Sequence, residues 1–226
     1  MYFPFKAPWG AYYSARKLKK LGARLGGCGI MVERTVKIGR GVSLFGPCIV
    51  SGKTELKSNS RVLAFSRVED SVIGCGASVS SSTVICSEVG ENSAVGPYAY
   101  LRGGAKVGKD CRVGDFVEIK NSSLGNGSKA AHHAYIGDAD VGSGVNIGCG
   151  VVFANYDGKV KARTTVGDHC FIGCNCNIVA PVHIGGGAYI AAGTTVTQNV
   201  AERELCIGRA RQSAIKDGAE GRYKNG

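Results

Sequence analysis

The chain has 226 residues, of which 44% are apolar, enough for one large domain or two small ones. Its 35 glycines and only 5 prolines favour many tight turns in an ordered backbone and argue against disorder. The formal net charge of +11 permits an anionic partner, but no dense basic block or aromatic-rich basic stretch is present, so we expect neither nucleic acid nor membrane as partner.

The N-terminal segment, residues 1–32, is predicted to contain one short helix. Within SARKLKKLGARL, residues 14–25, Ser14 is a potential cap and the three leucines form one apolar stripe. The preceding residues lack the apolar core and cleavage site of a signal peptide, and no apolar run approaches the roughly 18 residues of a membrane span. The ten cysteines contain no Cys-x-x-Cys pair, which favours reduced cysteines in a cytoplasmic protein.

A six-residue repeat dominates residues 33–200. In the stretch VGENSAVGPYAYLRGGAKVGKDCRVGDFVEIK, an aliphatic residue recurs at every sixth position and a small or β-branched residue follows four positions later. This pattern is the signature of a hexapeptide β-solenoid, in which each repeat supplies a short strand and a bend. The spacing of three and four residues that a helix requires is absent. The sequence therefore predicts an all-β domain built as a parallel β-helix.

Two features depart from the repeat. The stretch NYDGKVKARTT, residues 155–165, suspends it, and a polar insertion in a solenoid is a favoured place for function, although a neutral surface loop is the alternative. After Val200 the chain becomes polar and basic, and we interpret residues 201–226 as a C-terminal arm.

Two adjacent histidines, His132 and His133, lie within GSKAAHHAYIGDADVGSGVNIGCG. The repeat places both at outward-facing positions, where each is available for chemistry. Histidine can act as a base near neutral pH or bind a metal. Periodicity alone does not distinguish a catalytic base, a metal ligand and an unremarkable surface residue.

Several stretches, in this order and spacing, closely resemble the acetyltransferase domain of the bacterial bifunctional glucosamine-1-phosphate N-acetyltransferase / N-acetylglucosamine-1-phosphate uridyltransferase. The stretches are VGDFVEIK, GSKAAHHAYIGDADVG, VNIGCG, NYDGKVK, APVHIGGGAYIAAGTTVT and IGRARQ. The resemblance implies a left-handed parallel β-helix that assembles as a homotrimer with active sites between subunits. It also implies transfer of an acetyl group from acetyl-coenzyme A to the 2-amino group of glucosamine 1-phosphate.

The same resemblance assigns site residues position by position. It places the general base on His132, which follows GSKAA directly, and leaves His133 as a neighbour of unassigned role. The positions that match substrate-binding residues are Arg102, Lys120, Tyr135, Asn146, Asn155, Tyr156 and Lys161. Arg102 and Lys120 would meet the sugar phosphate, and Asn155 and Tyr156 would lie near the acetyl group. The positions that match cofactor-binding residues are Cys149, Cys174, Ala192 and Arg209.

The sequence also departs from that family. Nothing resembles its uridyltransferase domain, so we expect neither that activity nor a metal requirement, and a separate uridyltransferase is a possible partner. Cys149 and Cys174 stand where the family commonly has alanine and serine, and a thiol is a weak hydrogen-bonding partner. The product would enter UDP-N-acetylglucosamine synthesis for peptidoglycan and lipopolysaccharide with its lipid A.

Three alternatives remain open at this point. The first is acetylation of another amino sugar on the same fold. The second is a zinc hydratase that uses His132, His133, His169 and His183, which would require three converging nitrogen ligands. The third is a non-catalytic β-helix scaffold.

Overall fold

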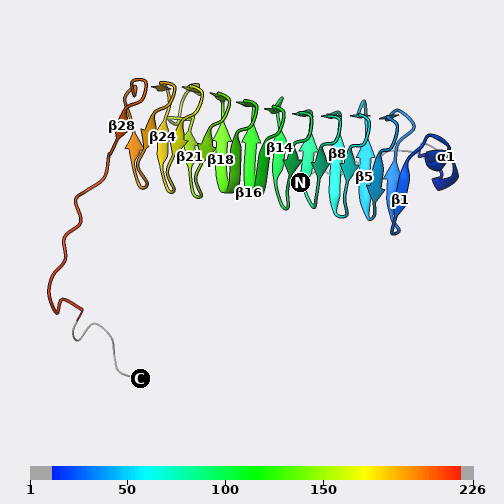
Figure 1. Ribbon diagram of the computed structural model, residues 1–226, viewed down its shortest axis with the longest axis horizontal. Coiled ribbons are helices and arrows are strands. Elements are labelled where there is room, and N and C mark those ends of the chain that lie inside the picture. Colours follow the sequence, from blue (N-terminus) through cyan, green and yellow to red (C-terminus); the bar gives the residue numbers. More distant parts are fainter. Residues whose placement is uncertain (1–11, 220–226) are drawn as a thin grey trace.

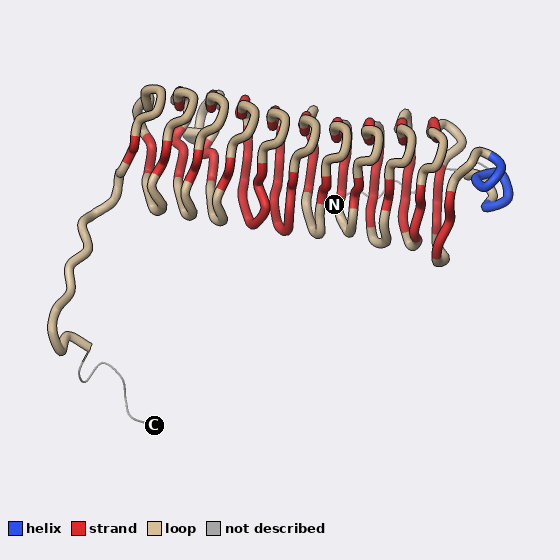
Figure 2. The backbone as a smooth tube through the Cα atoms, in the orientation of Figure 1, coloured by secondary structure: helices blue, strands red, loops and turns tan. Residues whose placement is uncertain are grey.

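The computed structural model describes residues 12–219, which form one elongated solenoid of short parallel strands (Figure 1). Each coil adds one strand to each of three parallel ladders, and the turns between strands form the corners of the solenoid (Figure 2). The β-solenoid predicted from the six-residue repeat is thereby confirmed.

The three ladders are named first, second and third in the order in which the chain enters them. The first contains β1 (Arg24–Gly26), β4 (Ser43–Phe45), β7 (Arg61–Val62), β10 (Ser78–Val79), β13 (Ala94–Val95), β20 (Asn146–Ile147), β23 (Phe171–Ile172), β26 (Tyr189–Ile190) and β28 (Leu205–Cys206). The second contains β2 (Ile30–Val32), β5 (Cys48–Ser51), β8 (Ser66–Glu69), β11 (Thr83–Ile85), β14 (Tyr100–Arg102), β21 (Val152–Ala154), β24 (Asn177–Val179) and β27 (Thr195–Val196). The third contains β3 (Lys37–Ile38), β6 (Glu55–Leu56), β9 (Val72–Ile73), β12 (Glu88–Val89), β15 (Lys106–Val107), β17 (Ser123–Leu124), β19 (Ala139–Val141), β22 (Thr164–Val166) and β25 (His183–Ile184).

Two longer strands, β16 (Arg112–Lys120) and β18 (Lys129–Gly137), run through both the first and the second ladder. They pair in parallel over almost their whole length, including the turn between the two ladders. At that turn, a Cβ atom on Gly114 would lie 1.8 Å from the carbonyl oxygen of Ala131, so only glycine allows this close approach. The backbone of these two coils is therefore tightly matched at the first corner, the turn between the first and second ladders.

The core is a single stack of inward-facing aliphatic side chains. Leu44, Val113, Ile136 and Ile178 are all fully buried, as the repeat predicts. Burial of one such side chain stabilises the folded state by about 1.5–3 kcal/mol. Because each coil contacts only its neighbours, this contribution accumulates along the axis and holds the outward positions in register.

The two ends extend beyond the predicted boundaries at 33 and 200. The helix α1 (Ala15–Lys20) is shorter than expected, because the chain turns at Gly22, which has a positive φ of 85°, and starts β1 two residues later. The Ser14 side chain accepts a hydrogen bond from the backbone N–H of Lys17, as a cap should. At the other end, β28 still pairs with β26, and the arm then leaves the solenoid (Figure 1).

The insertion at residues 155–163 is an ordered hairpin-like loop. Tyr156 and Lys161 form an antiparallel bridge, and the Asp157 side chain accepts the backbone N–H groups of Lys159 and Val160, each at 2.8 Å. The third ladder resumes directly after the loop, because β22 pairs with β19 in the normal register. The loop thus projects from the solenoid without interrupting its stacking.

Candidate active site

His132 projects from the first corner, with 60% of its side chain exposed. Its Nδ1 lies 2.7 Å from the Oδ1 atom of Asp115, which occupies the register position opposite it on the preceding coil. The hydrogen bond from His132 is the largest cause of the lowered pKa of the Asp115 carboxyl. Asp115 is therefore a carboxylate at neutral pH, and the pair has the arrangement of an oriented base. His133 is also exposed, so both histidines face outward as predicted.

A second polar cluster lies at the second corner, the turn between the second and third ladders. Its centre is Asp138, which is only 7% exposed. The Oδ1 of Asp138 accepts a hydrogen bond of 2.5 Å from the Nδ2 of Asn121, its Oδ2 accepts one from the Nδ2 of Asn155, and the Nζ of Lys120 lies 3.8 Å from the same Oδ2. Two predicted substrate residues, Lys120 and Asn155, are thus brought together by one buried carboxylate.

The charge state of Asp138 follows from these contacts. Burial alone would raise the pKa of this carboxyl, but the hydrogen bonds from Asn121 and Asn155 and the positive charges of Lys120 and Lys161 outweigh it. The net effect is a lowered pKa, so Asp138 is ionised at neutral pH. Lys161, from the inserted loop, therefore belongs to the same electrostatic cluster.

The inserted loop is fastened to this cluster by Arg163. Its guanidinium forms contacts of 2.5 and 2.6 Å with the Asp140 carboxylate and donates to the carbonyl oxygen of Asn121 at 2.9 Å. This pairing lowers the pKa of Asp140 and raises that of Arg163. A bidentate contact of this kind fixes orientation as well as position. The Tyr156 hydroxyl donates to the carbonyl oxygen of Gly158 in the same loop.

The remaining predicted substrate residues lie between or beside these two clusters. Arg102 is paired with Glu118, with its Nη2 2.6 Å from the carboxylate. Tyr135 stands on the second ladder, in register with Glu118 on the coil before it. Asn146 lies on the first ladder, between Lys129 and Phe171. The structure therefore distributes the predicted substrate residues over two ladders and the second corner.

The four predicted cofactor positions form one line along the first corner. The backbone N–H of Gly150 donates to the carbonyl oxygen of His133, that of Asn175 to Cys149, and that of Gly193 to Cys174. These bonds stack the predicted residues Cys149, Cys174 and Ala192 on consecutive coils. Arg209 closes the line, because its Nη1 donates to the carbonyl oxygen of Ala192 at 2.7 Å. The line starts at the coil that carries His132.

Several residues of this site were not predicted. Asp115, Asn121, Asp138, Asp140 and Arg163 were all absent from the expected set, although each lies within or beside a motif. The available signal was coil spacing, since Asp115 and His132 are 17 residues apart, as are Asn121 and Asp138. One coil length thus brings each polar residue opposite its partner.

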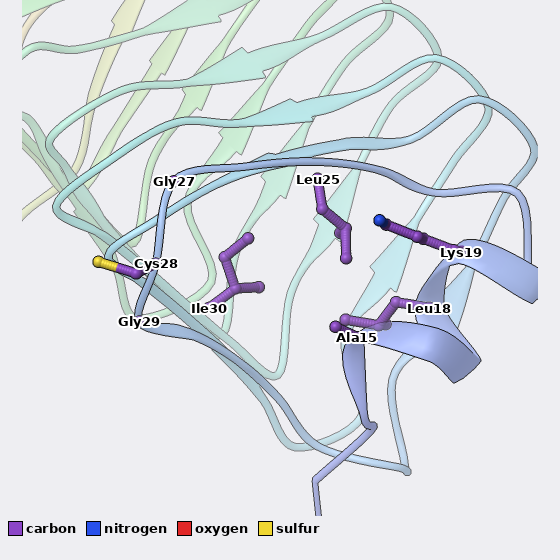
Figure 3. Close-up of a pocket in the computed structure, with 8 residues that line it drawn as sticks. All are labelled: Ala15, Leu18, Lys19, Leu25, Gly27, Cys28, Gly29 and Ile30. Atoms are coloured by element: carbon purple, nitrogen blue, oxygen red, sulfur yellow. The ribbon is translucent and has the colours of Figure 1, made fainter.

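Two other features lie away from this site. The described part of the chain holds no group of three or more His, Cys, Asp and Glu side chains placed to bind a metal, and the Nδ1 of His183 pairs with the Thr165 hydroxyl at 2.7 Å. The zinc alternative therefore lacks its ligand set within residues 12–219. A pocket of about 340 Å³ lies under α1, where Leu18, Leu25 and Ile30 line it (Figure 3). It contains none of the predicted site residues.

Comparison with known proteins gives a class and then a closer match. The model of the family "Bacterial transferase hexapeptide (six repeats)" matches residues 86–121 and 163–198. Among solved structures, LpxA, a UDP-N-acetylglucosamine acyltransferase from Bacteroides fragilis, superimposes with a TM-score of 0.57 at 15% identity, covering 81% of this chain and 69% of that chain. At this identity the likeness concerns the fold alone. The chain is thus a hexapeptide-repeat β-solenoid.

The sequence relatives are more specific. The bifunctional protein GlmU of Clostridium novyi (strain NT) is 51% identical over 168 residues, which are 74% of this chain and 37% of that protein. GlmU of Clostridium botulinum (strain ATCC 19397 / Type A) is 45% identical over 181 residues, or 80% of this chain and 40% of that protein. The resemblance drawn from the motifs is confirmed, and the chain spans about two fifths of the length of these relatives. No helix among residues 12–219 is long and apolar enough to cross a membrane.

Proposed function

We propose that this protein transfers an acetyl group from acetyl-coenzyme A to the 2-amino group of glucosamine 1-phosphate. The observation that carries the proposal is the single line formed at the first corner by His132, Cys149, Cys174, Ala192 and Arg209. This arrangement sets an oriented imidazole at one end of a track of backbone groups and a guanidinium at the other. The similarity to GlmU over three quarters of the chain supports the same reaction.

In the proposed reaction, the extended pantetheine arm of the cofactor lies along this track. Arg209 attracts its phosphates, and the thioester reaches His132. The Nε2 of His132 removes a proton from the substrate amine as the amine nitrogen attacks the thioester carbonyl carbon. The C–S bond then breaks, the amide is formed, and the proton passes to the departing thiolate of coenzyme A. The exposed thiols of Cys149 and Cys174 are neighbours of the cofactor without a chemical step of their own.

The polar cluster at the second corner would bind the sugar phosphate. Lys120 and Lys161 supply positive charge, Asn155 supplies an amide beside them, and Arg102 becomes available if it exchanges Glu118 for a phosphate oxygen. This role for the cluster gives the interrupted repeat at residues 155–165 a function and makes the neutral-loop alternative unnecessary.

A homotrimer with shared sites is part of the proposal. His132 and Asp138 are six positions apart along β18 and its end, so at about 3.3 Å per extended residue they lie at most about 20 Å apart. A monosaccharide phosphate is much shorter than this. The base of one subunit and the second-corner cluster of another would therefore act on the same substrate molecule.

The test is a coupled assay of thiol release from acetyl-coenzyme A with glucosamine 1-phosphate as acceptor. We expect His132→Ala to lower kcat by about 10²–10⁴-fold, the usual range for loss of a general base. The matched control is His133→Ala, which removes the neighbouring exposed imidazole and should retain most activity. An inactive wild type, or equal activity of the two alanine variants, would contradict the proposal.

Three further measurements test the alternatives and the assembly state. A panel of amino sugars, including nucleotide-linked ones, distinguishes glucosamine 1-phosphate from another acceptor. Titration calorimetry with acetyl-coenzyme A distinguishes an enzyme from a scaffold, because a scaffold has no reason to bind it. Sedimentation velocity gives the assembly state and tests the shared-site arrangement.

A further inference from the structure

Asp115 and His132 face each other across consecutive coils at the first corner. They are register partners in the pairing of β16 with β18, and one hydrogen bond of 2.7 Å joins their side chains. We propose that Asp115 is a positioning residue that fixes the tautomer and ring orientation of His132 and stabilises its protonated form during acetyl transfer. This inference rests on the proposed function for its kinetic consequences, while its structural part stands independently.

The chemistry of the pair determines which ring nitrogen carries the proton. An ionised carboxylate can only accept hydrogen bonds, so the Nδ1 of His132 must be the donor. In the neutral ring, the lone pair is then on Nε2, the atom that points away from Asp115. Within residues 12–219, His132 has no other hydrogen-bond partner among the protein side chains. Asp115 alone therefore determines the reactive form of the base.

Other charged groups near the pair do not replace Asp115. The nearest alternative carboxylate on β16, Glu118, is held by Arg102 at 2.6 Å and stands three residues further along the strand. In the pairing of β16 with β18, Arg112 and Lys129 are register partners three residues before the pair, and Glu118 and Tyr135 are register partners three residues after it. Of these, the positive charge of Arg112 contributes to the lowered pKa of the Asp115 carboxyl and so also favours the ionised carboxylate.

The backbone explains why the pair is so well aligned. Gly114, directly before Asp115, has no side chain, so the two coils can approach closely here. A Cβ atom at this position would lie only 1.8 Å from the Ala131 carbonyl oxygen. Phe116, directly after it, has a positive φ of 56°, so the chain turns sharply at this point. Asp115 is thus held at the turn by close backbone packing on one side and a defined bend on the other. Because its side chain is short, the carboxylate is held next to the imidazole ring of His132.

The experiment uses the full chain and three variants, Asp115→Ala, Asp115→Asn and Asp115→Glu. The control is Asp110→Asn, which removes an exposed carboxylate five residues earlier in the chain at a position with φ of 55°, a conformation that asparagine tolerates. We expect Asp115→Ala to lower kcat by about 10–100-fold with little change in KM for either substrate. Asp115→Glu should restore part of this loss, and Asp110→Asn should resemble the wild type.

One readout separates positioning from a merely structural role. Nitrogen-15 NMR of the labelled imidazole should show the Nδ1–H tautomer in the wild type and a mixture of tautomers in Asp115→Ala. The NMR measurement needs no substrate.

The outcomes are distinguishable. A wild type that does not acetylate glucosamine 1-phosphate while its NMR spectrum shows the Nδ1–H tautomer overturns the proposed function and leaves the orientation of His132 by Asp115 supported. If Asp115→Ala keeps the wild-type tautomer, the inference is overturned, even where activity falls together with the melting temperature.

Discussion

Substitution of Asp138 by asparagine tests whether the second corner is organised by a buried carboxylate. Asp138 accepts hydrogen bonds from the side-chain amides of Asn121 and Asn155. Asparagine has nearly the same shape and tolerates the positive φ of 48° at this position. However, one of its two polar atoms is a donor, so one of the two amides would face another N–H group. The substitution therefore removes one charge-assisted hydrogen bond and leaves the backbone unchanged.

The expected loss follows from that single bond. A hydrogen bond to a charged group contributes about 1.5–3 kcal/mol, and a donor left unpaired at a buried site has a cost of similar size. We expect Asp138→Asn to lower the free energy of unfolding by about 2–3 kcal/mol at neutral pH. Because Lys120 also loses its anionic partner, KM for glucosamine 1-phosphate should change as well.

The pH dependence gives the sharper test. The folded-state pKa of Asp138 is lowered, so the stabilisation by its carboxylate is complete above the ordinary aspartate pKa of about 3.9 and is lost as the pH falls through the lower folded value. Urea titrations should therefore show a constant difference between wild type and variant from about pH 8 to pH 5, and a smaller difference in more acidic buffer. Asp110→Asn is the exposed control. Equal stabilities of wild type and Asp138→Asn at pH 7 would refute the reasoning.

Three further predictions concern other parts of the site. Gly114→Ala should lower both the melting temperature and the rate of acetyl transfer, because the new Cβ would collide with the Ala131 carbonyl oxygen. Thermal unfolding and the thiol assay measure these two effects. An unchanged melting temperature would contradict the close approach of the two coils. Arg163→Ala should free the inserted loop from Asp140 and raise KM for the sugar phosphate about 10-fold, with a smaller effect on KM for acetyl-coenzyme A. Steady-state kinetics with each substrate varied in turn measures both values. A larger rise in KM for acetyl-coenzyme A than for the sugar phosphate would contradict this prediction. The double variant Cys149→Ala, Cys174→Ser should keep KM for acetyl-coenzyme A within about 3-fold, because the ladder at these positions uses backbone carbonyls; a larger rise would assign the thiols a direct contact.

Most of the fold could be predicted from the six-residue pattern, because one buried aliphatic side chain is enough to locate each strand of two or three residues. Leu44, Val113 and Ile178 were each expected inside and are fully buried. The end of α1 could not be predicted, because the leucine spacing in SARKLKKLGARL is compatible both with one continuous helix and with a shorter helix followed by a strand. Gly22 decides between them through its backbone conformation.

The site was readable only where a motif carried it. His132 was assigned by its context, and Cys149, Cys174 and Ala192, assigned in the same way, lie on consecutive coils; their roles stay predictions. Asp115 was missed because three regular repeats would have placed Gly114 opposite His132. The five-residue step between Ile119 and Leu124 shortens the coil to 17 residues and moves Asp115 into that place. Asp138 was missed because alternation does not say which way a corner side chain turns.

The inserted loop has a consequence for how this protein can change over time. The strand that follows it, β22, pairs with β19 as if nothing had been inserted, and Arg163 holds the loop through Asp140. Residues can therefore be added or removed between Tyr156 and Lys161 at little thermodynamic risk to the coils that carry His132. The loop and His132 are separate units of variation, so under the proposed function acceptor preference can change while the base and the cofactor track are retained.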